Sequence, residues 1–246
     1  GKGSIGISTL IPIQQEQVKT LKRFRNVYEI AYQRYTDISL AEEQSRRVQI
    51  DLALERVRAR TMAMQKSEEL AAVAEVLRKE MGALGVEELE TSSIYIVDDR
   101  AEMSECWYAI KDIRGKNKKL VTDHMTLQLE ETWVGRQMKK FHRSKRSRTS
   151  ILMQGENRKE WINYCAEKSS VLQGYYGGKI PDRTYHLLKF SNGFLGAASP
   201  GEISAESWDL LQRATAVFSF AYTRFSDLKK AEAQAREAAI ELGLER

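Results

Sequence analysis

Residues 185–198 read YHLLKFSNGFLGAA, and this stretch decides the fold. Two apolar runs, 185–190 and 194–198, flank Asn192-Gly193. Asn-Gly is the dipeptide that most strongly indicates a tight turn between neighbouring antiparallel strands. The stretch therefore predicts a β-hairpin near the end of an antiparallel sheet.

Other elements follow outward from this hairpin. Short runs rich in β-branched and aromatic residues predict further strands over 91–97, 105–110, 119–129 and 148–153. Apolar residues at helical spacing predict helices over 67–85, with Ser67 as the N-cap, over 133–141, over 157–169, and from Ser204 onward. This order predicts an α+β domain, in which helices cover one face of a central antiparallel sheet and pocket-forming segments cover the other.

A long helix is expected before this domain. Residues 14–64 contain neither proline nor glycine, and the whole chain of 246 residues has only three prolines. A helix over this stretch would be about 75 Å long at 1.5 Å per residue. A second long helix is expected at the other end of the chain.

The two ends of the chain resemble each other. Residues 31–56 and 221–246 match without a gap, and 13 of these 26 positions are identical. The match indicates a tandem array with a period near 190 residues. We therefore expect 1–13 to be the closing strand of a preceding module, 14–64 a linker helix, 65–212 the domain and 213–246 the exit helix.

Both long helices carry apolar residues in alternating steps of three and four, which is the spacing of a coiled-coil seam. The seam residues expected at a dimer interface are Ile38, Ala41, Val48, Leu52, Ala59, Met62, Leu228, Ala235 and Leu242. Polar residues interrupt the seam at Ser45, Glu55 and Glu245. The pattern favours a parallel homodimer, and a long solvated helix packed on its own domain is the alternative.

Several phrases resemble the GAF domain of bacterial signalling proteins, in particular tandem GAF sensors that feed histidine kinases. They are LERVRARTMAM at 54–64, LGV at 84–86, SIYIV at 93–97, GFLG at 193–196, WDLL at 208–211 and AYTRF at 221–225. The resemblance implies a regulatory input module of a two-component system, which dimerises through its flanking helices and passes a change to an output domain. Motifs for cyclic nucleotides, a chromophore or haem are not seen, so the resemblance identifies no cofactor.

Aromatic residues are dense in the domain and could line a pocket for a planar ligand. The candidate ligand-binding residues are Tyr95, Trp107, Trp133, Tyr185 and His186. An ordinary aromatic core is the alternative for all of them. Cys106 and Cys165 are expected to be buried structural cysteines, and a reactive thiol is the alternative for Cys106.

Composition excludes several classes. The net charge of +5 is modest, and six of the basic residues lie within 139–148 (KKFHRSKRSR). Two cysteines and three scattered histidines offer no metal site by spacing. GKGSIG at 1–6 matches the dinucleotide-binding pattern G-x-G-x-x-G, but it lacks the preceding strand and the following βαβ unit that the pattern needs. No P-loop or hydrolase motif occurs, so we expect no enzyme. No apolar run is long enough for a membrane span, and no signal peptide is seen, which favours the cytoplasm.

These observations favour a non-enzymatic sensor that relays a signal between modules of one polypeptide. Two other functions stay open. One is a ligand-free dimerisation spacer. The other is a nucleic-acid-binding module that uses the basic run 139–148.

Overall fold

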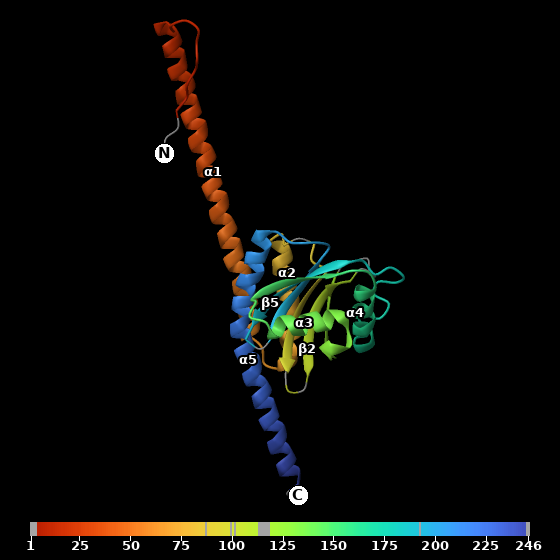
Figure 1. Ribbon diagram of the computed structural model, residues 1–246. Helices are drawn as coiled ribbons and strands as arrows, with labels where there is room; N and C mark the ends of the chain where they lie inside the picture. Colours follow the sequence, from red (N-terminus) through yellow and green to blue (C-terminus); the bar gives the residue numbers. More distant parts are fainter. Residues whose placement is uncertain are drawn as a thin grey trace. The chain divides into compact units, whose positions relative to one another are not determined.

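The computed structural model describes residues 4–86, 88–98, 100, 102–112, 119–191 and 193–244. Its helices are α1 (Gln15–Met62), α2 (Leu70–Ala83), α3 (Trp133–Arg143), α4 (Gly155–Lys168) and α5 (Ala205–Leu244) (Figure 1). Its strands are β1 (Thr91–Asp98), β2 (Met103–Lys111), β3 (Leu120–Leu127), β4 (Arg148–Met153), β5 (Arg183–Phe190) and β6 (Gly193–Ser199). The expected long helix and the expected strands are confirmed.

The six strands form one sheet in the order β3-β2-β1-β6-β5-β4, and every neighbouring pair is antiparallel. The predicted hairpin is present, because Phe190 pairs with Gly193. Asn192 lies outside the described residues. A Cβ atom on Gly193 would lie 1.8 Å from the carbonyl oxygen of Tyr95 in β1, so a glycine is required there by the neighbouring strand as well.

Helices cover both faces of the sheet (Figure 1). The last turns of α1, together with α2 and α5, pack against one face, which we call the helix face. Helices α3 and α4 and the loop after α4 pack against the other, which we call the cavity face. The predicted α+β layering, with long helices on one side and pocket-forming segments on the other, is confirmed.

The chain divides into two compact units, Gly1–Gln49 and Ile50–Arg246. This division differs from the expected boundary between residues 64 and 65, because Ile50, Leu54 and Val57 are already buried in the core of the second unit. The expected boundary at residue 213 also falls inside that core. Phe218 and Phe225 lie beyond it and are buried under the sheet.

Helix α1 has two contrasting faces. Ile50, Leu54, Val57 and Met64 follow one stripe and its end, and they are buried against the domain. The seam residues of α1 lie on the opposite stripe and are exposed, namely Ile38, Ala41, Val48, Leu52, Ala59 and Met62. The domain therefore buries the face of α1 that the heptad pattern leaves free.

The predicted seam residues of α5 differ in exposure. Leu228 is half-buried and packs against the core of its own domain. Ala235 is exposed, whereas the side chain of Leu242 lies outside the described residues. Leu228 is partly covered because α5 is still packed in the core at Phe225, about one turn before it.

Two local predictions differ from the structure. The sequence predicts a strand within 1–13, but residues 4–14 form neither strand nor helix, and residues 1–3 lie outside the described residues. Ser67 was expected to cap the second helix, but α2 begins at Leu70 after a 3₁₀ turn, Ser67–Glu69. The Glu69 carboxylate instead accepts hydrogen bonds from the backbone N–H groups of Gln65 (3.0 Å) and Lys66 (3.1 Å). These bonds hold the turn between α1 and α2.

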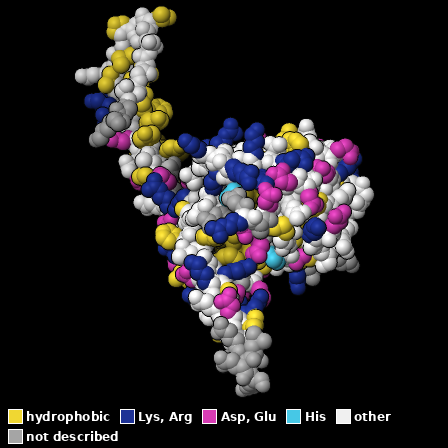
Figure 2. Space-filling model, turned by 60° about the horizontal axis from the view of Figure 1, so that its bottom comes forward, with side chains coloured by type: hydrophobic (Ala, Val, Ile, Leu, Met, Phe, Trp, Pro, Cys, Tyr) yellow, Lys and Arg dark blue, Asp and Glu magenta, His cyan; other side chains and the backbone are white. Residues whose placement is uncertain are grey.

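Basic and acidic side chains are interspersed over the visible face of the domain (Figure 2). Within the basic run, Lys139 is buried and pairs with Glu102 (3.1 Å) and Glu130 (2.6 Å). The Arg148 guanidinium lies 5.0 Å from the ring of Trp208. Within the described part of the chain, no helix has the length and apolarity that crossing a membrane requires.

Candidate functional site

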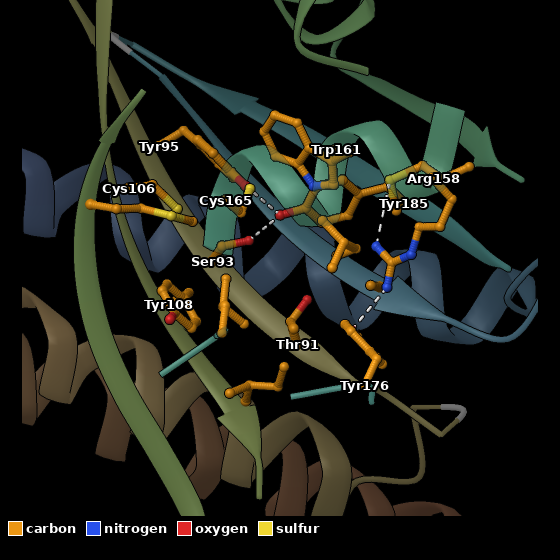
Figure 3. Close-up of a pocket in the computed structure, with 16 residues that line it drawn as sticks. Thr91, Ser93, Tyr95, Cys106, Tyr108, Arg158, Trp161, Cys165, Tyr176 and Tyr185 are labelled. Carbon is orange, nitrogen blue, oxygen red and sulfur yellow. Dashed lines mark hydrogen bonds between the residues drawn. The ribbon is translucent and has the colours of Figure 1, made fainter. Parts of the chain in front are cut away.

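A small cavity lies between the cavity face of the sheet and α4 (Figure 3). Strands β1, β2 and β5 form its floor through Tyr95, Cys106 and Tyr185, and Trp161 and Cys165 cover it from α4. Its volume is about 40 Å³. Ordinary small-molecule sites have roughly 300–1,000 Å³, so in this conformation the cavity has room for a few waters and little more.

Strand geometry explains which side chains reach the cavity. Successive residues of a strand point to opposite faces, so Tyr95 and its partner Cys106 share the cavity face with Tyr185. Trp161 and Cys165 are four residues apart and therefore lie on the same stripe of α4. Both are buried, which confirms the prediction for Cys165.

Three hydroxyl groups form a buried cluster on the cavity floor. The Tyr185 hydroxyl is hydrogen-bonded to the Tyr95 hydroxyl (2.7 Å) and to Ser93 Oγ, and Figure 3 shows the three groups together. Burial raises the pKa of both tyrosines above its ordinary value, so the cluster is neutral at physiological pH. Gly196 makes room for it, since a Cβ there would lie 2.7 Å from the Tyr185 hydroxyl oxygen.

Both cysteines of the chain line this cavity as free, buried thiols. Burial raises the pKa of Cys106 to about 12 and raises the pKa of Cys165 as well. Such thiols are protonated at neutral pH and are poor nucleophiles. Across the part of the chain that the structure describes, no three His, Cys, Asp or Glu side chains gather as a possible metal site.

A buried ion pair closes one end of the cavity. The Arg158 side chain is only 3% exposed, and its Nη2 donates to Glu90 Oε2 (2.9 Å) and to the Tyr176 hydroxyl (3.0 Å). Its Nη1 has a sulfur acceptor, Met153 Sδ at 3.9 Å, which is a weak partner. The charge of Arg158 is therefore balanced by Glu90, while one edge of the guanidinium has little hydrogen bonding.

The loop 169–182 completes the wall beside this ion pair. Tyr176 donates from its hydroxyl to Glu90 Oε1 (2.7 Å), and Tyr175 donates to the backbone oxygen of Lys111. Gly174 and Gly177 have φ values of +63° and +60°, a conformation that glycine adopts without strain. Two tyrosines thus fasten a loop whose backbone turns depend on glycine.

The structure brings together two of the five predicted ligand-binding residues. Tyr95 and Tyr185 line the cavity. Trp107 and His186 lie on the helix face of the sheet, because each is adjacent in sequence to a cavity residue and so points the other way. Trp133 lies at the start of α3, along a separate surface hollow with Asn157 and Glu160.

Trp107 and His186 have structural roles. His186 Nε2 is 2.8 Å from Ser199 Oγ, its Nδ1 is 3.1 Å from Ser150 Oγ, and its ring meets Trp208 of α5 edge-on at 5.3 Å. The Trp107 ring packs edge-on against Phe225 of α5, with ring centroids 5.3 Å apart. Both residues therefore fasten α5 to the sheet.

Sequence reasoning missed the polar part of the site, namely Arg158, Glu90 and Tyr176. Arg158 has a signal in hindsight, since it precedes Trp161 by three residues and so shares the inward stripe of α4. Glu90 and Tyr176 lie in loops, where no periodicity reports on burial. A charged residue on an apolar helix stripe is the pattern that would have found the site.

The tyrosine hydroxyls and the thiols of the cavity are neutral, and the charge of Arg158 at its end is paired with Glu90. No protein-family model matches this chain, and a search of curated proteins found no match.

Proposed function

We propose that this chain is a GAF-like regulatory module that forms a parallel homodimer through its long helices and relays a signal between modules of a sensor of the histidine-kinase type. The observation that carries the proposal is the two-faced character of α1. One stripe, at Ile50, Leu54 and Val57, is buried in the domain, and the opposite stripe of seam residues is exposed. A heptad seam that its own domain leaves free is what a second helix would cover.

The cavity supports a sensory role. It contains buried polar groups, Ser93, Tyr95 and Tyr185, beside free volume, so a bound molecule could exchange hydrogen bonds with them. Its present size requires that the loop 169–182 moves when a larger ligand enters. A polar, loosely filled layer of this kind tolerates two arrangements better than a filled apolar core does.

A contact path runs from the cavity to the exit helix. Tyr185 faces the cavity, and the next residue, His186, contacts Trp208 of α5 on the other side of the same strand. A shift of β5 caused by a ligand would therefore change the packing of α5. In the proposed relay, α5 carries this bias to the next module as a population shift.

The dimer can be tested with two matched leucines. Leu52 is a seam residue, Leu40 lies off the seam on the same helix, and both are 52% exposed. We expect Leu52→Glu to weaken dimerisation at least about tenfold, because it places two like charges across the seam. Leu40→Glu should leave the dissociation constant unchanged. Sedimentation equilibrium of the full chain measures both.

Equal effects of the two variants would contradict a dimer built on the seam, and a wild-type chain that stays monomeric would contradict the relay.

The small cavity volume favours a second candidate, a ligand-free dimerisation spacer. The spacer predicts the same dimer but no change in its melting temperature with any small molecule.

A further inference from the structure

A second hollow lies at one end of the sheet, beside the cavity. Here β2 ends at Lys111, β5 begins at Arg183, and Glu90 immediately precedes β1. The hollow has a volume of about 490 Å³, which falls within the roughly 300–1,000 Å³ of small-molecule sites. We call it the basic cleft, and its charged lining residues are Arg78, Lys111, Lys179, Arg183, Glu88 and Glu90.

Charge in the basic cleft favours an anion. Four cationic side chains face two carboxylates. Glu90 is the buried carboxylate, and it is shared, since Arg158 approaches it at 2.9 Å and Arg183 at 3.3 Å. Two guanidinium groups on one carboxylate leave an uncompensated positive charge next to the cleft.

One guanidinium group of the cleft also has hydrogen-bonding capacity left. The Nε atom of Arg78 is buried and has no hydrogen-bond partner among the described residues, whereas the Nε atom of Arg183 faces Glu90 Oε2 at 3.3 Å without hydrogen-bond geometry. Arg78 is otherwise held by one bond, from its Nη2 to the backbone oxygen of Leu89. Because a buried N–H without an acceptor costs free energy, Arg78 would gain from an anionic oxygen that a small rotation of the side chain could reach.

An apolar wall accompanies these charges. Tyr176, Pro181 and Pro200 line the same cleft, and the Tyr175 and Tyr176 rings meet edge-on at 4.7 Å. Tyr176 also lines the cavity, where Figure 3 shows it next to Arg158. The ring of Tyr176 is thus a shared wall between the cleft and the cavity.

We propose that the basic cleft binds a small organic anion, a carboxylate or phosphate on a planar body. The anionic group lies between Arg78 and Arg183, and the planar body lies against Tyr176. The anion competes with Glu90 for Arg183, which changes the set of bonds around the carboxylate that holds Tyr176 and Arg158 in the wall of the cavity. The anion's role as a signal rests on the proposed function, whereas its binding does not.

The test is ¹⁹F NMR of the full chain labelled with 5-fluorotryptophan, titrated with benzoate, with phenyl phosphate and with neutral benzamide. The chain has four tryptophans, whose signals are assigned by Trp→Phe variants. We expect the two anions to shift the Trp161 signal, and benzamide to bind at least about tenfold more weakly. Trp208, on the helix face, should respond less than Trp161.

Variants locate the site. Arg183→Gln and Arg78→Gln should each weaken binding of phenyl phosphate at least about tenfold. Lys159→Gln is the matched control, because Lys159 is exposed and outside the cleft, and it should bind as the wild type does. A melting curve of each variant verifies folding, and if Arg183→Gln is unfolded, Arg78→Gln and Lys111→Gln decide.

Several outcomes would overturn the site: no binding of either anion at millimolar concentration, equal binding of benzamide, or unchanged binding by the folded arginine variants. Benzoate and phenyl phosphate distinguish a carboxylate site from a phosphate site. Sedimentation equilibrium of the same samples separates the two proposals, since a monomer that binds the anions would contradict the relay and leave the site standing.

Discussion

The two faces of the sheet are built from the same strands and differ in kind. The helix face packs aliphatic and aromatic side chains of α2 and α5, such as Leu77, Met81 and Phe218, against the sheet. The cavity face mixes apolar residues with tyrosine hydroxyls, two thiols and the buried Arg158. A filled apolar layer fixes one packing, whereas a polar layer with free volume can rearrange. We therefore expect the helix face, which holds α5, to be rigid, and the cavity face to be the one that rearranges.

The largest effect is expected on the helix face. Phe218 is fully buried and meets Phe190 edge-on at 5.1 Å. Phe218→Ala should lower the free energy of unfolding by roughly 3–5 kcal/mol, since it removes a buried ring and leaves a cavity. Phe220 on the same helix is exposed, so Phe220→Ala should cost less than about 0.5 kcal/mol. Urea denaturation of the full chain measures both, and a small loss for Phe218→Ala would break the comparison.

The next effect concerns the ion pair of the cavity face. Arg158→Met should cost about 3 kcal/mol, because it leaves the Glu90 carboxylate with the more distant Arg183 as its cationic partner and with the Tyr176 hydroxyl. The double variant Arg158→Met, Glu90→Gln should recover a large part of this loss, because it also removes the carboxylate that Arg158 had neutralised. The same urea experiment applies. If the double variant were as unstable as the single one, the loss would come from packing and not from charge.

A smaller effect is expected in the hydroxyl cluster. Tyr185→Phe removes the group that bonds both Ser93 and Tyr95, and it should cost about 1 kcal/mol in the free energy of unfolding. Tyr32→Phe, at an exposed tyrosine of α1, should change nothing measurable. A Tyr185→Phe variant more stable than the wild type would indicate that the cluster is not satisfied by these bonds.

The last prediction concerns the two thiols, for which we expect no reaction in the folded chain. Burial holds the pKa of both thiols above its ordinary value, with Cys106 at about 12, so neither ionises appreciably near pH 8. Ellman's reagent should therefore find no reactive thiol in the folded chain and both thiols in guanidinium chloride. Fast reaction of a thiol in the folded chain would mean that the cavity opens to solvent more readily than its burial indicates.

Much of this fold was predictable from local patterns. The strands, the long helices and the hairpin follow from runs of one residue class, and the layers follow from their order. The residue at which α1 joins the core of the domain was not predictable, because residues 50–62 continue a helix without any break in composition. Ile50, Leu54 and Val57 follow a helical apolar spacing, but this spacing alone does not tell whether their own domain or a second helix covers them.

The site was harder to predict, for two physical reasons. Aromatic residues mark buried strands on either face, so Trp107 and His186 could not be separated from Tyr95 and Tyr185 without the register of the sheet. Loop residues such as Glu90 and Tyr176 acquire their roles through contacts across 86 positions of sequence. Periodicity is silent about such contacts.

The measurement that tests the central claim most directly is the mass of the wild-type chain in solution, by native mass spectrometry at micromolar concentration. A helix-linked relay predicts twice 28.2 kDa. A small additional mass that is lost on unfolding would further support ligand binding. A species of 28.2 kDa alone would contradict the dimer, and with it the proposed transmission of a signal through the exit helix.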